Sequence, residues 1–153
     1  MNNIIFLGFN DKSHFPEGKW KLEPDFCKWT SFNLVCLVFR DMSLGIWKGW
    51  VGLPSNHLFF KKTVDKILDY DQVLDLFFSV HGGISKAGYL PYKYSNHSDD
   101  LWWIGIETCH SEDFMPLAEL ENKNDSAKQV YKDFSFIRRE TKKLAKFLSL
   151  IKE

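Results

Sequence analysis

The 153-residue sequence has few cysteines, no excess of charge of either sign and no long hydrophobic run. Cys27, Cys36 and Cys109 are odd in number and contain no C-x-x-C pair, which argues against a disulfide framework or a zinc finger. Twenty basic and twenty acidic residues cancel, so clustered positive charge and a nucleic-acid partner are not expected. No segment approaches the roughly 20 apolar residues of a membrane helix, and the first residues lack the basic region of a signal peptide. We therefore expect a cytoplasmic protein without membrane contact and with all three thiols free. None is expected to be catalytic, since Cys109 and its neighbour His110 would point to opposite sides of a strand.

Aromatic residues, in contrast, are abundant. The chain has 14 Phe, 6 Trp and 5 Tyr, and its hydrophobic fraction of 44% is high enough to exclude general disorder. A chain of this length can bury a core without help from disulfides or metal. The composition therefore predicts one domain over residues 1–153, and it does not indicate an activity.

Four apolar segments predict the strands of one sheet. They are residues 33–40, 46–53, 77–81 and 101–108. Residues 1–30 are rich in turn formers and are expected to form an irregular N-terminal arm, although residues 3–9 also fit a short strand. A helix is predicted from Thr63, as its cap, through Leu76.

The C-terminal residues 126–152 have the clearest helical pattern. Ser126 and Gln129 match a capping box, and apolar residues recur at steps of three and four from Val130 to Ile151. A helix with one apolar stripe has to bury that stripe against a partner. The expected fold is therefore α+β, with a mostly antiparallel or mixed sheet and this helix packed on it.

Two motifs at predicted strand ends carry groups that can do chemistry. His81 precedes Gly82 and Gly83, and two glycines allow a ligand to approach the backbone closely. Alternatively, this segment is a tight turn with a structural histidine. The second motif places Glu107, His110 and Asp113 where a strand ends, and it is equally compatible with a strand exit that carries solvated acids.

Three histidines, His57, His81 and His110, each follow a predicted strand. If the strand ends share one edge of the sheet, the imidazoles would form one pocket. A metal site is chemically possible there, but scattered histidines are weak support for one, so neither a metal nor a cofactor is predicted. Trp102 and Trp103 must face opposite sides of their strand, which leaves Trp103 as a candidate to stack against a ligand.

Four segments resemble sequence blocks of a known family. Residues 49–57 are similar to G-Y-V-x-V-P-x-x-H-P, residues 80–84 to V-H-G-G-L, residues 102–113 to W-x-x-G-F-D-C-A-H-x-x-D, and residues 131–145 to Y-x-x-L-x-Y-V-x-x-E-x-x-x-L-A. These blocks occur in this order in a family of small phage and prophage proteins, most of which have no assigned function. The resemblance places six residues on motif positions: His57, His81, Gly82, Gly83, His110 and Asp113. Glu107 stands where the motif has Asp, and Thr108 where it has Cys.

Three functions are compatible with these observations, and a homo-oligomer is compatible with each. The first is a phage protein of the host cytoplasm that sequesters a small phosphorylated or nucleotide-like ligand, such as a host immune signal. Its expected ligand-binding residues are His57, His81, Gly82, Gly83, Trp103, Glu107 and His110. The second is a small hydrolase or phosphoesterase that uses His81 and His110 as acid and base, with Glu107 or Asp113 orienting one of them. The third is a protein that binds and inhibits a host factor.

Overall fold

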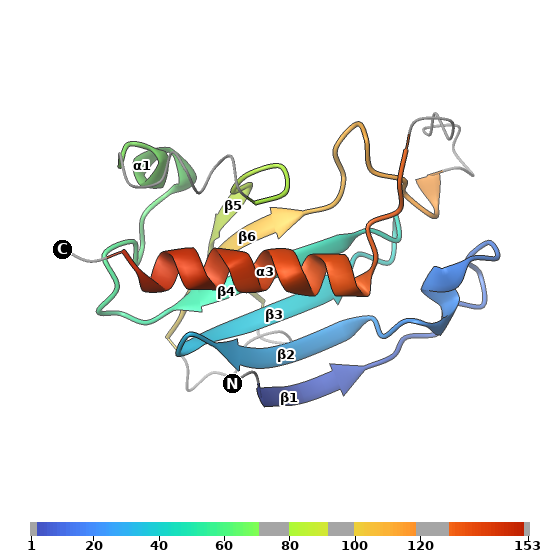
Figure 1. The fold of residues 1–153 in the computed structure, drawn as a ribbon, viewed down its shortest axis with the longest axis horizontal. Helices are drawn as coiled ribbons and strands as arrows, with labels where there is room; N and C mark the ends of the chain where they lie inside the picture. The colour runs from blue at the N-terminus through green and yellow to red at the C-terminus, as the bar shows by residue number, and fades with distance from the viewer. Residues whose placement is uncertain (1–2, 71–79, 92–99, 119–128, 152–153) are drawn as a thin grey trace.

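The computed structural model describes residues 3–70, 80–91, 100–118 and 129–151. Their strands form one antiparallel sheet in the order β1-β2-β3-β4-β6-β5, and a long helix lies across one face of it (Figure 1). The strands are β1 (Asn3–Gly8), β2 (Phe26–Ser31), β3 (Leu34–Arg40), β4 (Trp47–Leu53), β5 (Lys86–Gly88) and β6 (Trp102–Glu107). The helices are α1 (Val64–Leu68), α3 (Phe134–Ser149) and the 3-10 turn η1 (Lys19–Leu22). The α+β fold expected from the sequence is confirmed.

The strand predictions succeed in the centre of the sheet and fail at its first edge. Residues 33–40, 46–53 and 101–108 correspond to β3, β4 and β6. The prediction of an irregular arm over residues 1–30 is wrong, because β1 and β2 pair with each other and β2 pairs with β3. The alternative of a short strand over residues 3–9 is confirmed by β1. Of the predicted strand 77–81, residues 77–79 lie outside the described residues, and the last two lie in a bend and a turn.

The long helix begins later than its apolar pattern predicts. Asp133 is its N-cap, and one carboxylate oxygen accepts the Phe136 N–H at 2.8 Å. The predicted cap Ser126 lies outside the described residues, and Val130 forms an isolated bridge with Asp113 instead of a helical turn. For the shorter helix the predicted cap is confirmed, because Thr63 accepts the Lys66 N–H at 3.4 Å. The helix ends at Leu68, earlier than predicted, because residues 69 and 70 form a turn and a bend. The remaining predicted residues, 71–76, lie outside the described residues.

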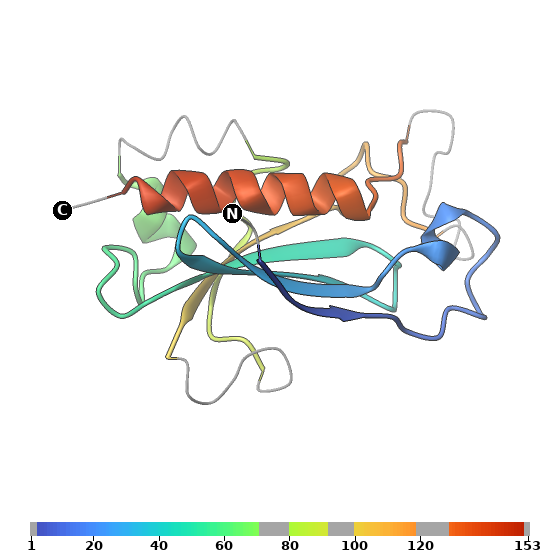
Figure 2. The same ribbon diagram turned by 60° about the horizontal axis from the view of Figure 1, so that its bottom comes forward.

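The main hydrophobic core lies between α3 and the sheet. Ile137, Leu144 and Leu148 of the helix are fully buried against β3 and β4. Gly49 on β4 makes this close approach possible, since a Cβ at this position would lie 2.1 Å from the Thr141 hydroxyl oxygen. Seen from the side, α3 covers one face of the sheet and leaves the other face uncovered by helix (Figure 2).

A buried charged network joins the N-terminal segment to the start of α3. The side chain of Arg40 is fully buried, and it donates to Asp25 at 2.6 Å and to the Tyr131 hydroxyl at 2.9 Å. Lys12 lies 2.5 Å from the other oxygen of Asp25, and Tyr131 donates to Glu23 at 2.5 Å. Two cations and two carboxylates therefore balance, which is the condition under which buried charge is tolerated.

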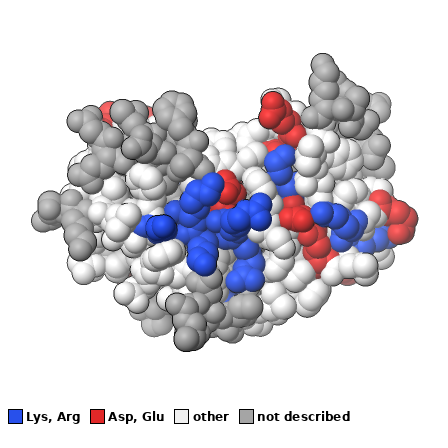
Figure 3. Space-filling model, viewed as in Figure 1, with Lys and Arg blue, Asp and Glu red and all other residues white. Residues whose placement is uncertain are grey.

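The solvent face of α3 gathers basic side chains although the chain has no net charge (Figure 3). Arg139, Lys142, Lys143 and Lys146 are exposed there, and Lys143 pairs with Glu140 at 2.9 Å. We expected no cluster of positive charge from the balanced composition, and this expectation is wrong. Overall charge does not reveal how charges are distributed, because a helix segregates its polar residues onto one face.

Candidate functional site

His81, His110 and Asp113 meet where two turns come together. His110 and Asp113 lie in the turn after β6, in which the Asp113 N–H donates to the His110 carbonyl at 2.9 Å. One oxygen of Asp113 accepts the His110 backbone N–H at 3.0 Å, and the same oxygen lies 2.7 Å from Nε2 of His81. The centroids of the two imidazole rings are 5.2 Å apart. We refer to these three residues as the histidine–aspartate cluster.

The turn that carries His81 requires glycine at the next two positions. Gly82 and Gly83 have φ of 67° and 73°, which is a left-handed conformation that other residues rarely adopt. A Cβ at Gly82 would lie 1.9 Å from Nε2 of His110. Gly82 is therefore needed both for the turn and for the close contact with His110.

The helix and the segment before it hold the cluster from the other side. The backbone N–H of His81 donates to the Glu140 carboxylate at 2.9 Å, and the His81 ring packs edge-on against Phe136 at 5.0 Å. Lys132 lies 3.2 Å from the second oxygen of Asp113. Residues from three distant parts of the sequence thus fix the positions of the two imidazoles.

The electrostatics of the cluster favour an ionised carboxylate. Burial raises the pKa of Asp113, but hydrogen bonds from His81, from the His110 N–H and from Lys132, together with the charge of His81, hold that pKa below its ordinary value. The Asp113 side chain is fully buried, whereas that of His81 is 20% exposed. Nε2 of His110 is buried without a hydrogen-bond partner among the described residues.

His57 does not join this cluster, so the expected pocket of three histidines is wrong. Its Nε2 donates to the Leu148 carbonyl at 2.8 Å, and its Nδ1 accepts the Phe59 N–H at 3.0 Å. His81 contacts α3 at Glu140, whereas His57 contacts it at Leu148. These two positions are about 12 Å apart along the helix axis. Because both ring nitrogens are used, His57 fixes the loop after β4 to the C-terminal end of α3.

Trp103 and Glu107 also lie apart from the two histidines. Side chains alternate along β6, so Ile104 and Ile106 enter the core under α3 while Trp103 and Glu107 point to the opposite face. Trp103 is only 1% exposed and packs beside Leu37 and Trp50. It therefore lies in a core, where it cannot stack against a ligand.

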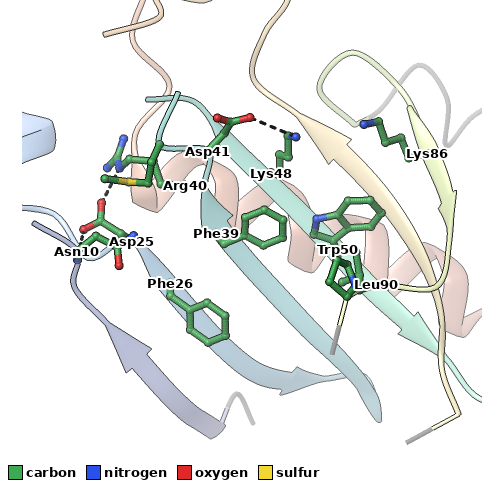
Figure 4. Close-up of a pocket in the computed structure, with 12 residues that line it drawn as sticks. Asn10, Asp25, Phe26, Phe39, Arg40, Asp41, Lys48, Trp50, Lys86 and Leu90 are labelled. Carbon is green, nitrogen blue, oxygen red and sulfur yellow. Dashed lines mark hydrogen bonds and ion pairs between the residues drawn. The ribbon is translucent and has the colours of Figure 1, made fainter. Parts of the chain in front are cut away.

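The face of the sheet opposite α3 contains a cavity of about 750 Å³. Aromatic side chains from three neighbouring strands, Phe26, Phe39 and Trp50, line it together with Leu90 (Figure 4). The complete lining is Asn10, Asp25, Phe26, Phe39, Arg40, Asp41, Met42, Lys48, Trp50, Lys86, Leu90 and Pro91. We call it the open-face cavity. The sequence interpretation missed it, although aromatic residues on alternate strand positions were a usable signal.

Polar groups surround the aromatic part of the open-face cavity. Lys48 pairs with Asp41 at 3.3 Å, and exposed Lys86 has no ion pair among the described residues. The indole nitrogen of Trp50 is buried and has no hydrogen-bond partner in the described part of the chain. In Figure 4 this nitrogen lies on the side of the ring that faces Phe39 and Lys48.

The thiols offer no nucleophile. All three cysteines are free, as predicted. Burial raises the pKa of Cys36 to about 12, and burial together with the Glu107 carboxylate raises that of Cys109 to about 11. Neither side chain forms an appreciable amount of thiolate near neutral pH. That no cysteine is catalytic stays a prediction.

Among the described residues, no helix combines the length and the apolar character needed to cross a membrane. The chain matches no protein-family model, no curated protein and no solved structure. Only its sequence and its geometry therefore bear on its function.

Proposed function

We propose that this protein binds and sequesters a small phosphorylated, nucleotide-like molecule in the open-face cavity. The observation that carries the proposal is the unpartnered indole N–H of Trp50, which is buried in an aromatic wall beside two lysines. The cavity of about 750 Å³ is in the range of small-molecule sites, which usually combine apolar walls with a few polar groups.

The aromatic wall suits a planar heterocycle. The rings of Phe39 and Trp50 are nearly parallel, with an interplanar angle of 14° and centroids 6.4 Å apart. Gly105 leaves room for the indole, since a Cβ there would lie 2.6 Å from the Trp50 ring. A nucleobase placed flat on this wall would gain stacking contacts of the kind that single-stranded nucleic-acid binders use.

The polar rim suits a phosphate group and a hydrogen-bond acceptor. Lys86 can pair with phosphate at no cost to an existing ion pair among the described residues, and Lys48 would share its charge between Asp41 and the ligand. The Trp50 N–H can only donate, and a buried donor without a partner lowers stability. A ligand acceptor at this nitrogen would remove that penalty.

Sequestration is favoured over hydrolysis because the cavity has no obvious catalytic group. No histidine, cysteine or serine occurs among the residues that line it in the described part of the chain. Its two acids, Asp25 and Asp41, are each paired with a cation. The counter-defence role implied by the phage-family resemblance depends on such binding, and it stays a prediction.

Calorimetric titration with AMP, ATP and a cyclic dinucleotide tests the proposal. At least one should bind, and Lys86→Glu should weaken its binding about tenfold or more, since a hydrogen bond to a charged group contributes about 1.5–3 kcal/mol. Lys142→Glu makes the same charge change on the solvent face of α3 and serves as the matched control.

Two results would contradict the proposal. If Lys142→Glu weakened binding and Lys86→Glu did not, the ligand would bind on the helix rather than in the cavity. If mass spectrometry of the incubated mixture found the nucleotide hydrolysed instead of intact, the phosphoesterase hypothesis would replace sequestration.

A further inference from the structure

We propose that the histidine–aspartate cluster, His81, His110 and Asp113, binds a divalent transition-metal ion, with zinc as the preferred ion. This inference does not depend on the nucleotide proposal, because Trp103 and the open-face cavity lie on the opposite face of the sheet from α3, which packs against the cluster. The sequence alone favours no metal, since nothing in the spacing of these residues shows that their two turns meet.

The donor atoms are close enough to surround one ion. Each of the three residues offers one donor atom, and these atoms all lie within 4.8 Å of one another. Zinc bonds of about 2.1 Å place the donors of a tetrahedral site about 3.4 Å apart. Small side-chain rotations would bring the cluster to that geometry. The 2.7 Å pair between His81 and Asp113 would open slightly and the wider separations would close.

The donor types favour zinc over magnesium or calcium. Two imidazole nitrogens and one carboxylate oxygen match the ligands of catalytic zinc sites, whereas magnesium and calcium prefer oxygen donors alone. Three protein ligands leave one coordination position for water or a substrate. The partial exposure of His81, 20% of its side chain, gives the ion access from solvent.

The surroundings already restrain the ligands as supporting hydrogen bonds do in metal sites. The His81 backbone N–H donates to Glu140, and the Asp113 carboxylate accepts the His110 N–H. His110 has a buried ring nitrogen without a partner among the described residues, which is the kind of atom that a metal bond would satisfy. Such supporting groups orient the ligands of a metal and raise its affinity.

Lys132 distinguishes a metal site from a cluster that only stabilises the fold. Its ammonium lies 3.2 Å from one oxygen of Asp113, so it repels a cation held at the other oxygen. Lys132→Met removes this charge and keeps an apolar side chain that can pack on Phe136, against which the lysine now lies. The variant should bind the metal more tightly than the wild type.

A zinc titration in competition with a chromophoric chelator, repeated with Co²⁺ while its visible absorption is recorded, tests the site. We expect one ion per chain and a tetrahedral Co²⁺ spectrum. His81→Gln should weaken zinc affinity by more than the 10–100-fold that loss of an outer hydrogen bond costs. His14→Ala, which removes an exposed histidine far along the chain, is the matched control, and Lys86→Glu should leave zinc affinity unchanged.

The proposal is overturned if folded wild-type protein binds no stoichiometric ion, or if His81→Gln binds zinc as tightly as the wild type. Circular dichroism of each variant keeps loss of folding separate from loss of a ligand. If His81→Gln is unfolded, Lys132→Met decides the question. Zinc affinity that falls or stays the same in a folded Lys132→Met protein contradicts a metal bound at Asp113.

Discussion

The two faces of the sheet are built from the same strands and differ in how completely they are covered, because α3 packs on one face and a cavity opens on the other. On the face under α3, aliphatic residues and Trp47 are fully buried in one continuous core. On the opposite face, Phe39 and Trp50 line a cavity together with Lys48 and Lys86, and one indole N–H lacks a partner among the described residues. Because side chains alternate along each strand, neighbouring residues lie on opposite faces. Those on one face stabilise the core, and those on the other are available to bind a ligand.

The histidine–aspartate cluster belongs to neither face. It lies in turns beyond the strand ends, where Phe136 and Glu140 of α3 complete it. Loops can carry reactive groups because a rigid scaffold positions them without enclosing them. We therefore expect substitutions in the core under α3 mainly to lower the free energy of unfolding. Substitutions on the opposite face should mainly weaken ligand binding.

The most severe test of this comparison is truncation of one leucine on each face. Leu144 is fully buried under the helix, so Leu144→Ala should lower the free energy of unfolding by about 2–5 kcal/mol. Leu90 lines the open-face cavity and is only partly buried, so Leu90→Ala should cost about 1 kcal/mol or less and should change nucleotide affinity. Urea unfolding followed by fluorescence measures both. Equal costs for the two variants would break the comparison.

A second prediction concerns the buried charged network at the end of the helix-covered core. Tyr131→Phe removes the hydroxyl that contacts both Arg40 and Glu23, and it should cost about 1–3 kcal/mol because charged groups lose a buried partner. Burial and the Glu23 carboxylate raise the pKa of Tyr131, so the hydroxyl is still a donor in alkaline solution. Tyr89→Phe, at a largely exposed position, is the control and should change the unfolding free energy little. Matching losses in the two variants would contradict a structural role for the network.

The sequence predicted the central fold because the central strands follow simple rules. Residues 33–40 and 46–53 are mostly apolar segments joined by a short turn, and a buried strand requires little more. Strand β2 was missed because it directly follows a stretch rich in turn formers, although Cys27 and Trp29 alternate with more polar residues as a half-buried strand requires. The start of α3 was misplaced because Val130 continues the helical spacing, although Asp133 is the residue that caps the helix.

The candidate sites were harder to predict because they depend on which segments meet. His81, Gly82 and His110 were identified as chemistry-bearing residues, and they do come together with Asp113. His57 was grouped with them because each of the three histidines follows an apolar segment. That pattern does not show that His57 contacts a different part of α3 from His81. The open-face cavity was missed for a related reason, since two of its aromatic walls are adjacent only once β2 pairs with β3.

The smallest expected effect concerns the N-cap of α3. A substitution there should change the stability of the helix-covered core without changing nucleotide binding on the opposite face. Asp133→Ala removes the oxygen that accepts the Phe136 N–H, and it should cost about 1 kcal/mol at pH 7. Asp133→Asn keeps an acceptor and should cost less, since only the pairing with exposed Lys19 is lost.

The pH dependence of stability should also differ between the wild type and Asp133→Asn. Burial raises the pKa of Asp133, but hydrogen bonds from Lys19 and from the Phe136 N–H hold it below its ordinary value. A depressed pKa contributes stability that is present above about pH 4 and is lost as the pH falls through the folded-state value. The stability difference between wild type and Asp133→Asn should therefore shrink in acid, as urea unfolding between neutral pH and acid can measure. A difference that stays constant over that range would mean that the charge of Asp133 does not stabilise the helix. An accompanying change in nucleotide affinity at pH 7 would mean that the two faces of the sheet are not independent.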